Sequence, residues 1–100
     1  MAVRFQMDEA KLAALCRRWK VGKLALFGSA IREDFRPDSD MDLLVTFLPD
    51  APWSALDLVT LQDELRILVG REVDLVEEAG LRNPFRRRRI LETMQVVYAG

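Results

Sequence analysis

The sequence has 100 residues, of which half are hydrophobic and 31% are charged, and its formal net charge is −1. This composition is typical of a folded globular protein, and we expect one domain spanning residues 1–100. The near-zero charge argues against binding nucleic acid or a membrane through a general basic field. The chain contains no histidine, which excludes histidine-based catalysis and histidine-ligated zinc. No apolar stretch approaches the roughly 20 residues that span a bilayer.

The first half of the chain alternates between helical and strand patterns. Apolar residues recur at helical spacing after Asp8, a capping residue, and Gly22 is expected to end this helix. Short apolar runs that follow it predict buried strands. The expected elements are a helix over 8–20, a strand over 23–27, a brief helix over 30–34 and a strand over 41–48.

Capping signals organise the second half. Ser54 and Asp57 resemble a capping box, and Gly70 stands where a C-terminal cap belongs. Asn83 before Pro84 is typical of a helix start. The expected elements are a helix between residues 54 and 70, a strand over 72–76, a helix over 84–93 and a short strand over 95–99. Their alternation predicts an α/β (α+β) fold, with helices packed on a small mixed β-sheet.

Three aspartates are the candidate catalytic residues. Asp40 and Asp42 open a predicted strand, and side chains two residues apart on a strand share a face. Adjacent carboxylates repel one another unless a cation lies between them, and Mg²⁺ prefers carboxylate and phosphate oxygens. Asp74 is a charged residue inside a strand of valine and leucine, which is costly unless it is paired or bound to metal. If its strand lies beside the first, Asp74 can complete a two-metal site.

Gly28 and Ser29 form a candidate phosphate cradle at a predicted strand-to-helix turn. Glycine allows a ligand close to the backbone, and the amides that open a helix donate to anions. The hydroxyl of Ser29 adds a donor for a phosphate oxygen. In isolation, a turn glycine followed by a helix-capping serine is the better explanation of this pair. The joint pattern, Gly-Ser followed by ten residues and then Asp-x-Asp entering an apolar strand, favours a phosphate cradle beside a metal site.

The motif around these residues resembles a known family. Leu26-Phe27-Gly28-Ser29, then Arg32, then the run from Pro37 to Val45 with Asp40 and Asp42, is similar to the minimal nucleotidyltransferases of the DNA polymerase beta superfamily. Asp74 matches the third carboxylate of that family, and the resemblance covers nearly the whole chain. It implies a polymerase beta palm-like nucleotidyltransferase fold.

The resemblance also implies an activity. Members of this size are typically antitoxins encoded with a HEPN-family ribonuclease toxin, and they transfer AMP from ATP to a tyrosine of that partner. Asp40, Asp42 and Asp74 would hold two Mg²⁺ ions. The triphosphate would contact Gly28, Ser29, Ser39 and Arg32. A chain of 100 residues has little room to hold an acceptor, so a hetero-oligomer is expected.

Two other functions compete with this hypothesis. One is an antitoxin that neutralises its toxin by covering it, without catalysis; the presence of all three aspartates and the Gly-Ser pair favours activity. The other is a transferase or binder directed at nucleic acid, against which the low charge and small size argue.

Several side chains allow more than one interpretation. The arginines at 86–89, with Arg82, could form a solvated helix face, contact an acidic partner or contact RNA, in that order of preference. Trp53 could be an interface anchor or a packed residue. Cys16 is interpreted as a core residue, and a single cysteine in so small a chain fits a reducing cytoplasm.

Overall fold

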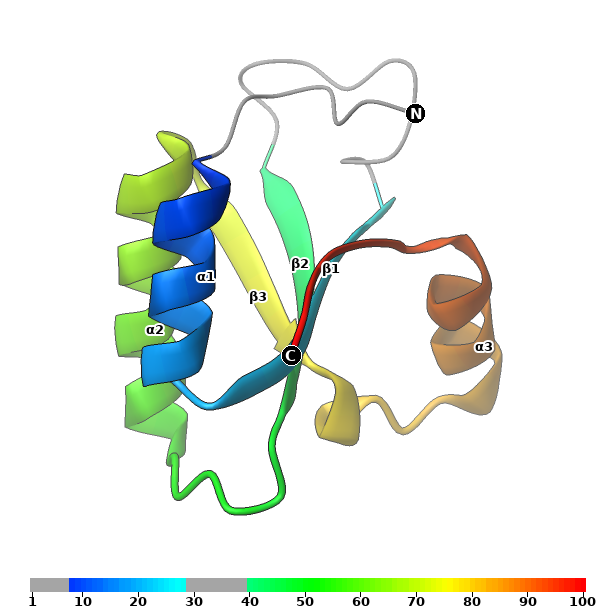
Figure 1. Ribbon diagram of the computed structural model, residues 1–100. Coiled ribbons are helices and arrows are strands. Elements are labelled where there is room, and N and C mark those ends of the chain that lie inside the picture. Colours follow the sequence, from blue (N-terminus) through cyan, green and yellow to red (C-terminus); the bar gives the residue numbers. More distant parts are fainter. Residues whose placement is uncertain (1–7, 29–39) are drawn as a thin grey trace.

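The computed structural model describes residues 8–28 and 40–100, which form two helical layers around one sheet (Figure 1). Helices α1 and α2 lie side by side on one face of the sheet, and α3 lies on the other. The helices are α1 (Glu9–Arg18), α2 (Ala55–Val69) and α3 (Pro84–Thr93). The strands are β1 (Val21–Phe27), β2 (Met41–Phe47), β3 (Val73–Glu77) and β4 (Gln95–Ala99), and a 3-10 turn η2 (Glu78–Gly80) follows β3.

The sheet is mixed, as expected. Its strand order is β3-β2-β1-β4. Strand β1 pairs antiparallel with both β2 and β4, whereas β2 and β3 are parallel. Helix α2 provides the crossover that a parallel pair requires. The expected α/β fold with helices on a small mixed sheet is therefore confirmed.

Strand alternation builds a different core on each face of the sheet. Met41, Leu43 and Val45 of β2 belong to the larger core with residues of α1 and α2. Leu44, between them, belongs to a smaller core with Phe27, Leu81 and Ile90. Ile90 is the only residue of α3 that is fully buried among those described. The α3 face of the sheet is thus thinly covered.

The predicted caps are present. The amide of Lys11 donates to Oδ1 of Asp8 at 3.0 Å, and the amide of Ser54 donates to Oδ2 of Asp57 at 2.9 Å. Gly70 ends α2 in the left-handed conformation, with a φ of 76°. Asn83 caps α3 by accepting from the amides of Phe85 and Arg86.

Two boundary predictions need correction. Gly22 does not end the first helix: α1 ends at Arg18, and Gly22 lies inside β1, where the pairing with β2 is irregular. Lys20 supplies the positive φ instead, at 55°. Strand β1 begins two residues earlier than expected, β2 ends one residue earlier and β3 lies one residue later, because register with neighbouring strands sets where pairing ends; β4 has its expected bounds. The helix expected over 30–34 lies outside the described residues.

Trp53 and Cys16 both pack against other residues of this chain. Indole Nε1 of Trp53 donates to the carbonyl oxygen of Trp19 at 2.6 Å, and the two rings lie 4.8 Å apart between centroids. Trp53 therefore stabilises this fold from within. Cys16 is fully buried, and burial raises the pKa of its thiol to about 11. In the part of the chain that the structure describes, no helix is long and apolar enough to cross a membrane.

Candidate active site

The candidate site lies at the end of the sheet where β2 begins. The side chain of Asp42 projects toward the α3 face, because its neighbours Met41 and Leu43 are buried on the other face. Asp40 immediately precedes β2 and is exposed. Strand β3 lies parallel to β2 with Asp74 in register with Asp42. The condition that sequence reasoning set for Asp74, a strand adjacent to that of Asp42, is therefore met.

This register brings two like charges together. Neighbouring strands lie about 4.8 Å apart, so the two carboxylates stand side by side on one face. Asp42 is half-buried and Asp74 is exposed. The pairing reaches the end of the sheet, since the amide of Met41 donates to the carbonyl oxygen of Glu72 at 2.9 Å. The result is a pair of neighbouring carboxylates at this end of the sheet, of which that of Asp74 is exposed.

Gly28 closes one side of this site. It follows Phe27, which is in register with Asp42, and its φ is 61°, a conformation that favours glycine. A Cβ at this position would overlap Oδ2 of Asp42. Glycine is thus required here twice, once for the backbone conformation and once for the space that the Asp42 carboxylate occupies. We call Gly28, Asp40, Asp42 and Asp74 the aspartate end.

Ser29, Arg32 and Ser39, which were predicted to bind the triphosphate, lie outside the described residues. Among residues 8–28 and 40–100, no group of three or more aspartate, glutamate, cysteine or histidine side chains is gathered closely enough to hold a metal ion. The structure thus pairs Asp42 with Asp74 through the strand register, and Asp40 lies two residues before Asp42 along the chain.

The donor chemistry of the aspartate end fits Mg²⁺. This ion is usually held by one or two carboxylates that act together with waters and substrate phosphates, so it does not require a complete cage of protein ligands. Asp42 and Asp74 supply hard oxygen donors from rigid strands, and Gly28 leaves the space beside Asp42 free of a side chain. Such an arrangement can bind a nucleoside triphosphate through a shared cation.

A second polar cluster occupies the other end of the same sheet face, and sequence reasoning missed it. Glu78 accepts from Oγ1 of Thr46 at 2.6 Å and from Nη2 of Arg87 at 3.0 Å. Its Oε1 also lies 3.4 Å from Nζ of Lys23. We call Glu78, Thr46, Lys23 and Arg87 the Glu78 cluster. The only signal in the sequence was polar residues at strand positions, Lys23 and Thr46, which lie on the same face as Asp42.

The carboxylate of Glu78 is stabilised in its charged form by the other members of the cluster. The hydrogen bond from Thr46 lowers the pKa of Glu78 most, and Lys23 and Arg87 lower it further, against an opposing effect of burial. The side chain is 16% exposed. Nη1 of Arg87 also donates to the backbone carbonyl of Glu78 at 3.1 Å. The cluster therefore fastens α3 to the sheet and has a structural role.

Comparison with known proteins identifies the family of this chain. The family model described as "Nucleotidyltransferase domain" matches residues 9–97. Protein adenylyltransferase MntA of Thermococcus cleftensis is 34% identical over 82 residues, which cover 82% of this chain and 81% of that protein. MJ1217 of Methanocaldococcus jannaschii, assigned as a protein adenylyltransferase, is 35% identical over 80 residues, which cover 80% of each chain.

Solved structures agree with the sequence relatives. A protein assigned as a minimal nucleotidyltransferase superposes with a TM-score of 0.70 at 36% identity, covering 86% of this chain and 85% of its own. A toxin–antitoxin complex with AMP-PNP contains a chain of the same fold, with a TM-score of 0.73 at 20% identity, covering 94% of this chain and 75% of that one. The resemblance found in the motifs is confirmed, and the chain belongs to the nucleotidyltransferase domain family of enzymes.

Proposed function

We propose that this chain, acting as a single domain, is an antitoxin that transfers AMP from ATP to a tyrosine of a HEPN-family toxin. The observation that carries the proposal is the register of Asp42 with Asp74 beside the closely approaching Gly28. Relatives at 34–35% identity are named or assigned as protein adenylyltransferases. Solved structures of the same fold come from toxin–antitoxin complexes, one of them with AMP-PNP.

The aspartate end binds the nucleotide in this proposal. Asp40, Asp42 and Asp74 would hold two Mg²⁺ ions, which would supply positive charge to neutralise the phosphates. The backbone at Gly28 approaches the triphosphate, because no side chain intervenes there. Ser29, Ser39 and Arg32 complete the phosphate contacts. Positioning and charge neutralisation then supply most of the catalysis, as is usual in phosphoryl-group chemistry.

The reaction exchanges one phosphorus–oxygen bond for another. The phenolic oxygen of the acceptor tyrosine forms a bond to the α-phosphorus of ATP. The bond from that phosphorus to the oxygen bridging to the β-phosphorus breaks, and pyrophosphate leaves with the electron pair. The phenolic proton passes to the carboxylate of Asp74, which is exposed.

The small size of the chain supports a protein acceptor. The described residues form one sheet with three helices, and no further domain covers the aspartate end among them. A partner that carries the acceptor tyrosine would bring that side chain to the aspartate end. On this proposal the pair works in the cytoplasm, where ATP and Mg²⁺ are available.

The test is transfer of labelled AMP from α-labelled ATP and Mg²⁺ to the HEPN partner encoded beside this chain. Wild type is compared with Asp40→Ala/Asp42→Ala and with the surface control Asp50→Ala. We expect label on a partner tyrosine with wild type and with the control, and none with the double variant.

Two results would contradict the proposal. Label that persists in the Asp40→Ala/Asp42→Ala variant would remove these residues from the site. A partner that is silenced in a stable complex, without label from any nucleoside triphosphate, would identify an antitoxin that acts by binding alone.

A further inference from the structure

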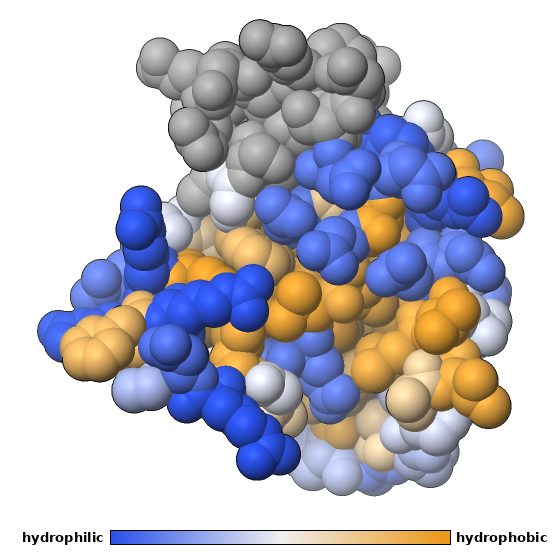
Figure 2. All heavy atoms as spheres, turned by 180° about the vertical axis from the view of Figure 1, so that it is seen from behind, coloured by the Kyte–Doolittle hydropathy of each residue, from blue (hydrophilic) through white to orange (hydrophobic). Residues whose placement is uncertain are grey.

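The charge of this chain is strongly segregated. Between residues 82 and 92 there are five arginines and one glutamate, a net charge of +4, so the remainder of the chain carries −5. The basic segment comprises α3 and the residues just before it. Long hydrophilic side chains project from this region in Figure 2, where α3 lies on the left. A near-neutral total charge therefore conceals one basic surface on an acidic molecule.

The arginines of this segment differ in what they contact. Arg87 turns inward to the Glu78 cluster, and Arg88 pairs with Glu92 on the same helix at 3.3 Å. Arg82, Arg86 and Arg89 are exposed, and they form no ion pair with another residue in 8–28 or 40–100. The preferred sequence interpretation, a solvated face, therefore describes only part of the run.

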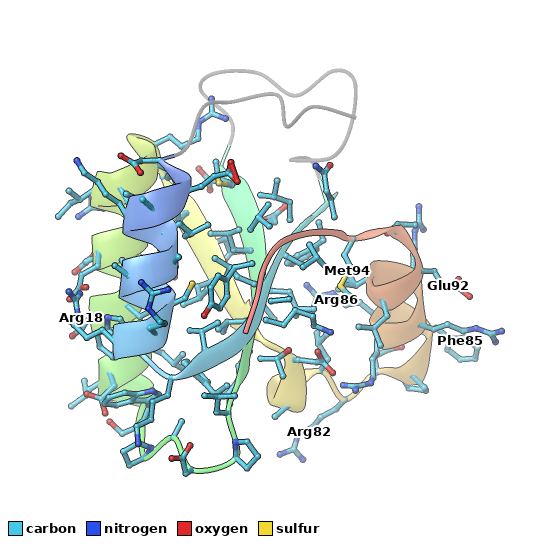
Figure 3. The ribbon with its side chains drawn as sticks, in the orientation of Figure 1. Arg18, Arg82, Phe85, Arg86, Glu92 and Met94 are labelled. Atoms are coloured by element: carbon cyan, nitrogen blue, oxygen red, sulfur yellow. The ribbon has the colours of Figure 1, made fainter. Side chains whose placement is uncertain are left out.

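An exposed aromatic ring lies on the same helix as Arg86 and Arg89. Phe85 is 82% exposed, and Figure 3 shows it pointing away from the sheet at the outer surface of α3. Arg89 lies four residues after Phe85 and three after Arg86, so it is a neighbour of both along the helix, while Arg86 lies on the sheet side of α3 near Met94 in Figure 3. We call Arg82, Phe85, Arg86 and Arg89 the α3 surface.

The opposite side of the helix fixes its orientation. Ile90 is buried, Leu91 and Met94 pack against the smaller core, and Arg87 makes two hydrogen bonds to Glu78. Helix α3 cannot rotate to bury Phe85 without breaking these contacts. The α3 surface is therefore held outward by the fold.

We propose that the α3 surface docks an acidic protein surface that has an apolar recess for Phe85, and that this acidic surface belongs to the HEPN-family partner. Exposed aromatic and arginine side chains on one element are a common composition for a protein interface. The three arginines match acidic side chains on the partner, which speeds association and sets orientation. This inference rests on the proposed function only for the identity of the partner.

Other occupants fit the charge distribution less well. A symmetric dimer through α3 would place arginines against arginines. Contact of α3 with the acidic remainder of a second copy would be a head-to-tail interface, which builds an open-ended filament unless it closes into a ring. RNA extends beyond a helix of ten residues, and the remaining net charge of −5 would repel its phosphates. A folded partner can present acidic groups to α3 alone.

The experiment measures the affinity of the full chain for the HEPN partner by calorimetry at two salt concentrations. Arg86→Glu/Arg89→Glu is compared with Lys11→Glu/Arg17→Glu, which changes the net charge equally at exposed positions of α1. We expect the α3 variant to weaken binding at least about tenfold and to reduce its salt dependence. The α1 variant should bind as wild type does. Phe85→Ala should weaken binding about tenfold without changing the salt dependence.

The outcomes separate this inference from the proposed function. Equal binding by wild type and the α3 variant overturns the inference, even if AMP transfer is intact. Loss of binding in the α3 variant supports it, even if Asp42 proves dispensable for transfer. Tighter binding of wild type to a single-stranded 20-nucleotide RNA than to the partner, lost in the α3 variant, overturns the inference in favour of RNA. A shared melting temperature shows that all variants are folded.

Discussion

One face of the sheet carries acidic groups at both ends, and their surroundings differ between the two ends. At the aspartate end, the β2–β3 register sets Asp74 beside Asp42, so that like charges accumulate. At the other end, Lys23, Arg87 and Thr46 surround Glu78 and hold its pKa below the ordinary value of 4.5. A carboxylate held by cations and a hydrogen bond stabilises a fold, whereas two neighbouring carboxylates can share a cationic ligand.

This comparison shows why composition alone cannot assign function to an acidic residue. Asp74 and Glu78 are four residues apart along the chain. Asp74 is the second residue of β3, and Glu78 directly follows its last residue. The first is exposed beside another carboxylate, and the second is largely buried among cations. Substitution at the two ends should therefore separate activity from stability.

The largest effect is expected for Asp74→Asn at the aspartate end. If Asp74 is a proton acceptor and metal ligand, as the proposed function holds, its loss should lower AMP transfer at least about 100-fold. Because the change also removes like-charge repulsion at an exposed position, the free energy of unfolding should change by less than about 0.5 kcal/mol. Labelled transfer and urea unfolding measure the two quantities. A matching loss of stability would contradict a functional role for this carboxylate.

The next effect is expected for Gly28→Ala. The added Cβ would displace the Asp42 carboxylate and strain the positive φ, so transfer should fall at least about tenfold and stability by about 1–2 kcal/mol. Gly70→Ala is the matched control, since Gly70 has a φ of 76° but no atom within 4 Å of its added Cβ. It should lose stability through backbone strain alone and retain transfer. Equal loss of transfer in both variants would show that strain, and not Asp42, is responsible.

Glu78→Gln tests the opposite end. Removing the charge should cost about 1–2 kcal/mol of unfolding free energy, because hydrogen bonds to a charged group are lost or weakened. Transfer below the melting temperature should stay within about threefold of wild type. An activity loss as large as that of Asp74→Asn would erase the distinction between the two ends.

The pH dependence of stability reports on the environment of Glu78. The pKa of Glu78 is lower in the folded state, so its contribution is fully present above the ordinary value of 4.5 and is lost as the pH falls through the folded pKa. Below pH 4.5, wild type should therefore lose more stability than Glu78→Gln does. Parallel curves from thermal unfolding at several pH values would contradict the assigned environment of Glu78.

The smallest effect is expected for Thr46→Val. The variant removes the hydrogen bond to Glu78 at 2.6 Å and should destabilise the fold by about 1 kcal/mol. It should also raise the pKa of Glu78, because this hydrogen bond is the largest cause of its depression. An NMR titration of the Glu78 carboxyl measures the shift. Lys23→Met, which removes a longer contact of 3.4 Å, should raise the pKa by less.

Local signals in the sequence were sufficient for most of the elements. The caps at Asp8, Ser54 and Asn83 were predicted correctly, because a capping hydrogen bond spans only two or three residues. Gly22 misled the prediction, since a glycine within a strand resembles a helix stop when neighbouring strands are unknown. Pairing irregularities are set by the partner strand, and sequence patterns do not contain that information.

The candidate site was predicted in part. Strand alternation placed Asp40 and Asp42 on one face, and Gly28 was expected near them. The match of Asp74 to Asp42 needed the strand order, which the sequence left conditional. The Glu78 cluster was not foreseen, because its four members come from four separate elements.

The sequence by itself determined the fold class, the helix caps and the motif that identified the family. These depend on residues that are close along the chain, where periodicity and capping act. Tertiary structure alone decided that Asp42 faces Asp74, that Arg87 turns inward while Arg86 and Arg89 remain exposed, and that Trp53 packs on Trp19. Those outcomes depend on strand register and helix orientation, which are fixed by packing between segments far apart in sequence.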